Sequence, residues 1–286
     1  MKFIHLTDLH LVAPGRRLYG LDPNARLRAA IADINTNHAD AAFVLITGDL
    51  AHHGEPAAYE ALRAALAELA PPCHLLIGNH DDRAAFLHAF PAAPVDEHGF
   101  VQGVVATPAG SFVLIDTHEP GTHEGRLCER RLIWLDRTLE SLRGQAVFLA
   151  MHHPPLPLAL PAMDALRLRQ RGELAALLAR HGNVRHIFFG HVHRPSHGTW
   201  QGMPFSTLRG VNHQVAMHSG TPTGIPGSHE PPAYAIVLVE DGSVVVHVHD
   251  FLDESPRFDL FDQKAERAEC LTGQAQPRRD VRLQGG

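Results

Sequence analysis

Short apolar runs of strand length alternate with helical patterns over the first 90 residues of this 286-residue chain. Ala42–Ile46 is a continuous apolar run of the length of a buried strand, and Lys2–Leu6 and His74–Ile77 are two further expected strands. Asp22-Pro23 suits the N-cap and first position of a helix, and Pro56–Leu69 is a second helical segment rich in Ala, Leu and Glu. This strand–helix–strand order predicts right-handed βαβ units and a mostly parallel sheet.

The middle of the chain continues this alternation, whereas the last third is mainly β. Asp241-Gly242 between two apolar runs predicts a hairpin. Together the strands are too many for one sheet, so we expect an α/β fold with four layers, αββα, in which two mixed sheets lie face to face. The further expected strands are Phe100–Val105, Phe112–Asp116, Ala146–Met151, His186–Phe189, Trp200, Phe205–Leu208, Ala233–Glu240 and Ser243–Asp250, with helices at Glu129–Leu142 and Gly172–Arg180.

Composition indicates a folded protein with one main domain. Hydrophobic residues make up 44% of the chain and charged residues 20%, which is not a disordered composition. We expect the domain to span residues 1–262, with a loop-rich region at 194–232 that serves as a cap, a flap or an oligomerisation surface. Within it, Ser219–Pro232 is rich in Gly, Pro, Ser and Thr, and residues 263–286 form a polar tail.

Charge and cysteine content narrow the class of partner and the compartment. A formal net charge of -6 argues against a partner with a long phosphate backbone, so nucleic acid is not expected, although a small anionic substrate is compatible with it. Three scattered cysteines form neither a disulfide framework nor a CxxC zinc site, which fits the reduced cytoplasm. No apolar stretch reaches the roughly 18 residues of a membrane span, so no membrane partner is expected.

Polar clusters follow five of the expected strands at the point where each strand ends. They are Asp8-Leu9-His10, Gly48-Asp49, Gly78-Asn79-His80-Asp81, His152-His153-Pro154-Pro155 and Gly190-His191-Val192-His193. The carboxyl ends of the strands line the ligand crevice of an open α/β sheet, so the five clusters are expected to meet at one edge. Any one of them alone is more often a turn, but five metal-competent clusters at strand ends indicate a functional site.

The side chains of these clusters suit metal ions of intermediate hardness. Aspartate carboxylates, one asparagine carbonyl and several imidazoles, without cysteine, are donors for two first-row divalent or trivalent ions such as Fe, Mn, Co or Zn. From the residues alone, the division of the donors between two ions stays open.

The order Asp-x-His, Gly-Asp, Gly-Asn-His-Asp, His and Gly-His-x-His resembles the signature of the calcineurin-like metallophosphoesterases. The likeness extends to about residue 215, and the chain looks similar to the class III cyclic-nucleotide phosphodiesterases and bacterial glycerophosphodiesterases within that superfamily. This narrower likeness rests on Leu18-Tyr19-Gly20, Met151–Leu158, Ser206-Thr207-Leu208 and His213-Gln214. The resemblance implies hydrolysis of small phosphodiesters by a metal-activated water.

The resemblance also implies a ligand set. One ion would be held by Asp8, His10, Asp49 and His193, and the other by Asp49, Asn79, His152 and His191, with the Asp49 carboxylate as the bridge. Such a bridge reduces the repulsion between two cations about 3.5–4 Å apart. The family places the ligand of the paired histidines at His152, and the end of the preceding strand is consistent with this without deciding against His153.

Four more side chains acquire expected roles from the resemblance. His80 is similar to the family histidine that faces the leaving group, and it would donate a hydrogen bond or proton to the departing alkoxide. Asp81 would orient His80. Tyr19 and His213 resemble residues near the substrate pocket of the glycerophosphodiesterase relatives.

Several other functions stay open at this point. A phosphomonoesterase or a nuclease of the same superfamily would use the same metal site, and a non-catalytic metal-binding scaffold would share the fold. A nuclease should carry a basic face, which the net charge does not support, and scaffolds usually lose ligands that are all present here. We expect a homo-oligomer that hydrolyses small phosphodiesters, with Leu18-Tyr19-Gly20 and His213-Gln214 favouring glycerophosphodiesters over cyclic nucleotides.

Overall fold

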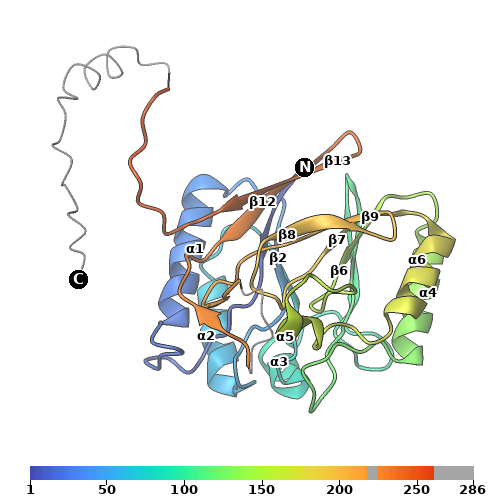
Figure 1. The fold of residues 1–286 in the computed structure, drawn as a ribbon, viewed down its shortest axis with the longest axis horizontal. Helices are drawn as coiled ribbons and strands as arrows, with labels where there is room; N and C mark the ends of the chain where they lie inside the picture. Colours follow the sequence, from blue (N-terminus) through green and yellow to red (C-terminus); the bar gives the residue numbers. More distant parts are fainter. Residues whose placement is uncertain (218–223, 261–286) are drawn as a thin grey trace, which may run out of the picture. The chain divides into compact units, whose positions relative to one another are not determined.

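Each of the two β-sheets combines parallel and antiparallel strands, with antiparallel strands at one edge of the first sheet and at both edges of the second (Figure 1). The computed structural model describes residues 1–217 and 224–260, and Met1–Leu252 form one compact unit. The first sheet has the order β13-β12-β1-β2-β3 and the second β4-β5-β6-β7-β9-β8. The strands are β1 (Lys2–Leu6), β2 (Val44–Thr47), β3 (Cys73–Leu76), β4 (Gly103–Thr107), β5 (Gly110–Leu114), β6 (Val147–Ala150), β7 (Val184–Phe188), β8 (Ser196–Trp200), β9 (Met203–Thr207), β12 (Tyr234–Glu240) and β13 (Ser243–His249), with β10 (Gln214–Val215) and β11 (Gly227–Ser228) as a separate pair.

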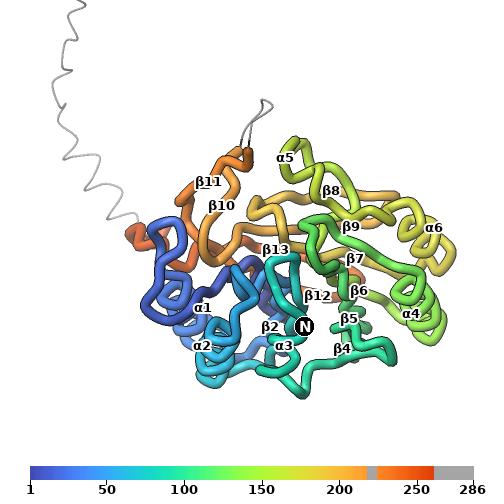
Figure 2. Tube along the Cα trace, turned by 90° about the horizontal axis from the view of Figure 1, so that it is seen from below, coloured from blue at the N-terminus to red at the C-terminus, as the bar shows by residue number. Residues whose placement is uncertain are grey.

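Helices cover the outer face of each sheet, as Figure 2 shows with α1 and α2 on one side and α4 and α6 on the other. Leu27 and Leu62, for example, pack into the core of the first sheet, and Leu135 and Leu178 into that of the second. The helices are α1 (Pro23–Asn37), α2 (Pro56–Leu66), α3 (Arg83–Ala89), α4 (Glu129–Ser141), α5 (Pro161–Asp164) and α6 (Arg171–His181).

A layer of aromatic rings lies between the two sheets. Phe3 of β1 has Phe43 stacked on it with ring centroids 4.9 Å apart, and it meets Phe112 and Phe188 of the other sheet edge to face at 5.0 and 5.4 Å. All four rings are buried. The two sheets therefore bury their facing sides against each other, and the expected four-layer αββα arrangement is confirmed.

Local signals in the sequence explain most element boundaries. The Asp22 carboxylate accepts a hydrogen bond from the Ala25 amide at 3.0 Å, and Pro23 stands in the first turn of α1 as expected. Asp241-Gly242 joins β12 to β13 with both residues at positive φ, which confirms the hairpin.

Two expectations about elements change. Helix α3 was not predicted, and its signal is the Asp82 side chain, which accepts from the Ala85 amide at 2.8 Å. The strand expected from Phe100 begins only at Gly103, because the amides of Phe100 and Val101 donate to the Asp96 and Asp116 carboxylates at 2.9 and 3.0 Å instead of to a neighbouring strand.

The expected flap and tail lie partly or wholly outside the described residues. Of Ser219–Pro232, the described part contains β11, which pairs with β10 through Gln214↔Ser228 and Val215↔Gly227. The tail at 263–286 falls entirely outside them, and residues 253–260 belong to a second unit. Within the described ranges, no helix has both the length and the apolar character needed to cross a membrane.

Candidate active site

The loops that follow β1, β2 and β7 bring the first expected ligand group together. The ligand atoms of Asp8, His10, Asp49 and His193 all lie within 4.8 Å of one another, and the four residues are buried. Asp8 Oδ1 lies 3.3 Å from His193 Nε2, and Asp49 Oδ2 lies 3.5 Å from His10 Nε2. Three loops that are distant in sequence thus place two carboxylates and two imidazoles around one point.

The second expected group lies on the other side of Asp49. Asp49 Oδ1 is 3.4 Å from His152 Nε2, while Asn79 Oδ1 is 3.1 Å from the same nitrogen and 2.8 Å from His191 Nδ1. His153 also lies close to this group, with a ring nitrogen within 4.8 Å of ligand atoms of His152 and His191, but its Nδ1 lies 2.8 Å from Thr117 Oγ1. One oxygen of the Asp49 carboxylate therefore faces each group, and of the two adjacent histidines it is His152 whose ring nitrogen lies beside Asp49.

Hydrogen bonds on the outer ring nitrogens determine which nitrogens are free to bind an ion. His152 Nδ1 lies 2.7 Å from the Thr47 carbonyl oxygen, and His193 Nδ1 lies 2.7 Å from the His213 carbonyl oxygen. A carbonyl can only accept, so both Nδ1 atoms carry hydrogen, and each ring in its neutral form, the form that binds a metal ion, has a bare Nε2. For His152 that nitrogen faces the Asp49 carboxylate and the Asn79 oxygen. A bare ring nitrogen and two oxygens, none of which can donate a hydrogen bond, thus face one another, and a bound cation would satisfy all three. These nitrogen and oxygen ligand atoms suit first-row metals.

The charges on Asp49 and His152 shift each other's pKa values in the direction that favours a positively charged partner beside Asp49. Burial alone would lower the pKa of His152, but the Asp49 carboxylate outweighs burial and raises it to about 9. Burial would likewise raise the pKa of Asp49, but His152 and His10 hold it well below its usual range. Asp49 is thus a carboxylate that stays charged in a buried site.

The backbone of the site is held in a sparsely populated conformation. Five of the seven expected ligands, all non-glycine, have positive φ: Asp8 (54°), His10 (46°), Asp49 (50°), His191 (71°) and His193 (49°). Each such conformation costs about 1–3 kcal/mol and persists only where the surroundings determine it. The fold therefore accepts a lower stability in return for orienting these side chains toward one another.

Glycines before two of the clusters permit the close approach of the loops. A Cβ at Gly190 would lie 1.8 Å from Thr7 Oγ1 and 3.0 Å from Asp8 Oδ2. A Cβ at Gly78 would lie 2.2 Å from Asp49 Oδ1. Both positions require a residue without a side chain, which explains the glycines of the Gly-Asn-His-Asp and Gly-His-x-His clusters.

His80 and Asp81 have different surroundings from those expected. His80 Nδ1 donates to the His52 carbonyl oxygen at 2.9 Å, so a backbone group orients this ring. Both Asp81 oxygens are engaged elsewhere, by the amides of Leu50, Ala51 and Gly78 and by the Tyr59 hydroxyl at 2.8–3.1 Å. The expectation that Asp81 orients His80 is therefore corrected: Asp81 is a buried anchor between the loops after β2 and β3, where burial raises its pKa to about 6.

A cavity of about 740 Å³ opens over the ligand groups. Tyr19 and His213 both line it, as the resemblance implied, and their rings meet with centroids 4.7 Å apart. Three lining histidines, His52, His123 and His229, were not singled out from the sequence. His52 stacks on His80 at 4.7 Å and has its Nδ1 3.0 Å from His10 Nδ1, and His123 Nδ1 accepts from the Asn79 side-chain amide at 2.9 Å. The position of His52, three residues after Asp49, could have indicated from the sequence that it lies at the site. No motif near His123 indicates this.

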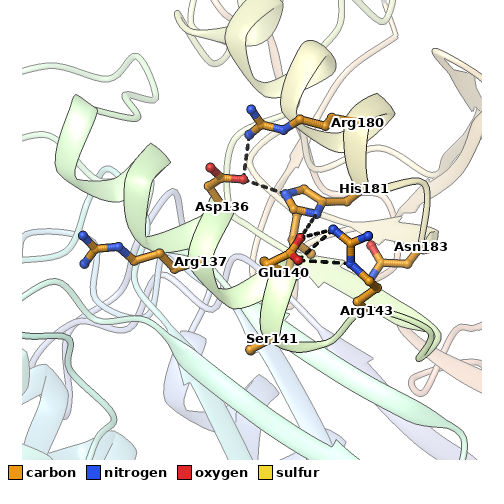
Figure 3. A pocket seen from close by; sticks show the side chains of 9 residues that line it. Asp136, Arg137, Glu140, Ser141, Arg143, Arg180, His181 and Asn183 are labelled. Carbon is orange, nitrogen blue, oxygen red and sulfur yellow. Dashed lines mark hydrogen bonds and ion pairs between the residues drawn. The ribbon is translucent and has the colours of Figure 1, made fainter.

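A second hollow of about 620 Å³ lies between α4 and α6, but its charges are already paired (Figure 3). Asp136 bonds to both Arg180 and His181 at 2.6 Å, and Glu140 holds Arg143 at 2.6 Å. The two Asp136 pairs tie α4 to α6 on the surface, whereas the Glu140–Arg143 pair is local to the end of α4. The catalytic chemistry of the described residues is thus concentrated at the strand ends.

Comparison with known proteins agrees with this geometry. Residues 1–195 match the family model of the calcineurin-like phosphoesterases. The chain is 47% identical over 268 residues to a probable cyclic nucleotide phosphodiesterase of Rhodopseudomonas palustris, covering 93% of this chain and 98% of the relative. It is 30% identical over 219 residues to the glycerophosphodiester phosphodiesterase GpdQ of Enterobacter lignolyticus, covering 75% and 79%. A dimetal phosphatase from Danio rerio shares the fold, with a TM-score of 0.66, 18% identity and coverage of 88% and 96%.

Proposed function

This chain belongs to the calcineurin-like phosphoesterase family, and from that premise we propose that it is a two-metal phosphodiesterase whose substrates are cyclic nucleotides. The family is metal-dependent, and the identity and number of the ions are part of the proposal. Asp8, His10, Asp49 and His193 would hold one ion, and Asp49, Asn79, His152 and His191 the other. The ions could be Fe, Mn, Co or Zn, since all suit this mixture of carboxylate, amide and imidazole donors.

One observation carries the proposal: seven donors from loops after five strands converge, with bare ring nitrogens facing carboxylate and amide oxygens. When bound, the ions activate water and neutralise charge on the phosphoryl oxygens. The Asp49 carboxylate separates the two positions. We assign His80 to the leaving group because its Nδ1 hydrogen is committed to the His52 carbonyl, which leaves Nε2 as the nitrogen that can donate a proton when the ring is doubly protonated.

The choice of cyclic nucleotides departs from the preference for glycerophosphodiesters that the short motifs suggested. Its support is the similarity over nearly the whole chain to a relative described as a probable cyclic nucleotide phosphodiesterase. We also propose the reduced cytoplasm as the compartment, which the free Cys73 and Cys128 support. Tyr19 and His213 are proposed to contact the substrate, since both line the cavity over the ligand groups.

A substrate panel tests the proposed activity. The protein is stripped with a chelator, reloaded with Mn, Fe, Co or Zn, and assayed on cyclic AMP, bis(p-nitrophenyl) phosphate and p-nitrophenyl phosphate. We expect the stripped protein to be inactive and the reloaded protein to have a higher kcat/KM for the diesters than for the monoester, because a cationic site with one bound hydroxide matches a monoanion. A higher kcat/KM for the monoester with the same metals and pH would overturn the proposal, as would full activity after stripping.

A further inference from the structure

The cavity over the ligand groups has two chemically different parts. Imidazoles and carboxylates of the candidate metal centre line one part. Four aliphatic side chains line another, and we call Met163, Leu166, Val215 and Ile225 the apolar wall. They come from α5, the residues after it and the β10–β11 pair, which lie side by side near the strand ends (Figure 2).

The apolar wall is attached to the metal-ligand loop. Met163 and Val215 are buried in a small cluster with Leu160 and Val192. Val192 stands between His191 and His193, two of the proposed ligands. Packing against Val192 therefore fixes the position of the apolar wall relative to the candidate metal centre. A site that binds one extended small molecule needs such a fixed distance between its two parts.

Two members of the wall are available for contact with a ligand. Ile225 is 49% exposed and Leu166 is partly buried, although both line the cavity. A flat, weakly hydrated group placed against them would remove apolar surface from water on both sides. Glycerol and choline or ethanolamine head groups are small and strongly hydrated, so they gain little there. A nucleobase has the required flat face.

Polar groups beside the wall are already engaged within the protein. The Gln214 side-chain amide bonds at both ends to the backbone of Gly210, at 2.8 and 2.9 Å. His229 Nε2 lies 2.9 Å from the Tyr19 carbonyl oxygen, and Ser228 Oγ accepts from the Glu230 amide at 3.1 Å. The wall therefore offers contact to the face of a base and little recognition of its hydrogen-bonding edge.

We propose that the apolar wall is the base-binding part of this active site, which holds the nucleobase of a cyclic nucleotide while the phosphodiester lies on the metal centre. This inference rests on the proposed function and adds the residues that select a nucleotide over a diester without a base. It assigns to α5 and the β10–β11 pair a role in specificity, separate from the chemistry at the strand ends.

Polar substitutions at the accessible end of the wall test this. Leu166→Asn and Ile225→Asn are made singly, with Ile133→Asn on α4 as the matched control, since Ile133 is 43% exposed and lies outside the cavity. Each metal-loaded protein is assayed on cyclic AMP and on glycerophosphoethanolamine, a diester without a base. We expect KM for cyclic AMP to rise about tenfold in the two wall variants with kcat nearly unchanged. The kinetics on glycerophosphoethanolamine and those of Ile133→Asn should match the wild type.

Conservative variants distinguish a lost contact from a disturbed fold. Leu166→Met and Ile225→Val should keep KM for cyclic AMP within about twofold, because they retain an apolar surface of similar size. Equal changes on both diesters, or an unchanged KM for cyclic AMP in both Asn variants, would overturn the base-binding assignment. A wild-type protein that does not hydrolyse cyclic AMP would refute the proposed function, whether or not it hydrolyses glycerophosphoethanolamine, whereas the outcomes above, in a protein that hydrolyses cyclic AMP, overturn the base-binding assignment alone.

Discussion

Three histidine rings of the candidate site are each positioned by a hydrogen bond on one ring nitrogen, which leaves the other ring nitrogen for the chemistry of the site. His152, His193 and His80 each commit Nδ1 to a backbone carbonyl oxygen, at 2.7, 2.7 and 2.9 Å. The bond selects the tautomer and orients the ring, so that Nε2 is the working nitrogen in all three. In our proposal, the first two rings bind metal ions through Nε2 in their neutral form, and the third donates a proton from Nε2 when it is doubly protonated.

Replacing His80 separates proton donation from metal binding. His80→Ala should lower kcat by about 10²–10⁴-fold on substrates with an alkoxide leaving group, because the proton donor is lost. The loss should be much smaller on bis(p-nitrophenyl) phosphate, whose nitrophenolate departs without a proton. Metal content measured by elemental analysis should stay at the wild-type level, since only the His80 backbone amide contacts Asp49. Equal losses on both kinds of leaving group would make His80 a positioning residue.

At the scale of elements, the site depends on how closely neighbouring strand ends approach each other. The loop after β7 passes over the loop after β1 at Gly190, where the His191 amide lies 3.1–3.2 Å from the Asp8 carboxylate oxygens. This contact holds Asp8, a proposed ligand on one loop, against His191, a proposed ligand on the other. The spacing of the strands, and not any single loop, sets the separation of the donors.

Gly190→Ala tests that dependence. The new methyl group would clash with Thr7 Oγ1 and press on the Asp8 carboxylate, so the loops should separate and the protein should bind fewer metal ions per chain. We expect kcat/KM to fall at least about 100-fold, a size typical of small misplacements of catalytic groups. Gly172→Ala is the control, because a Cβ there meets nothing within 4 Å and φ is not positive. Wild-type metal content in Gly190→Ala would contradict this account of the site.

At the scale of the whole molecule, two sheets enclose titratable groups within an aromatic layer. His186 is 6% exposed, its Nε2 lies 2.9 Å from Ser206 Oγ, and its ring centroid lies 4.4 Å from that of Phe188. Burial lowers its pKa from 6.5 to about 4. Below pH 6.5 the unfolded chain therefore binds a proton that the folded protein does not, and stability falls as the pH falls toward 4.

His186→Gln should remove this part of the pH dependence. Between pH 7 and pH 5 the free energy of unfolding of the wild type should fall by about 2 kcal/mol more than that of the variant, because glutamine does not titrate. The measurement is urea unfolding of both proteins at the two pH values, with chelator present so that metal release does not contribute. The same pH dependence in both proteins would show that the proton uptake lies elsewhere.

The sequence by itself determined the features that depend on near neighbours. Apolar runs, the Asp22-Pro23 helix start and the Asp241-Gly242 hairpin predict their elements because backbone hydrogen bonds and turn conformations act over a few residues. The ordered clusters at the strand ends indicated a metal site for the same reason, since parallel strands separated by helices send their carboxyl ends to one edge. Helix α3 was not predicted, although the Asp82 cap that marks its start is as local a signal as the Asp22-Pro23 helix start.

Only the tertiary structure decided which side chains face each other. His153 and His152 are adjacent in sequence, yet strand geometry sends one ring to Thr117 and the other to Asp49. The Asp81 carboxylate joins two loops instead of orienting His80, because the amides that it accepts from belong to different strand ends. The apolar wall likewise combines Met163 of α5 with Val215 of β10 and with Ile225, which precedes β11, although both lie more than 50 positions after Met163. Such contacts arise from the packing of distant elements, for which neighbouring residues carry no signal.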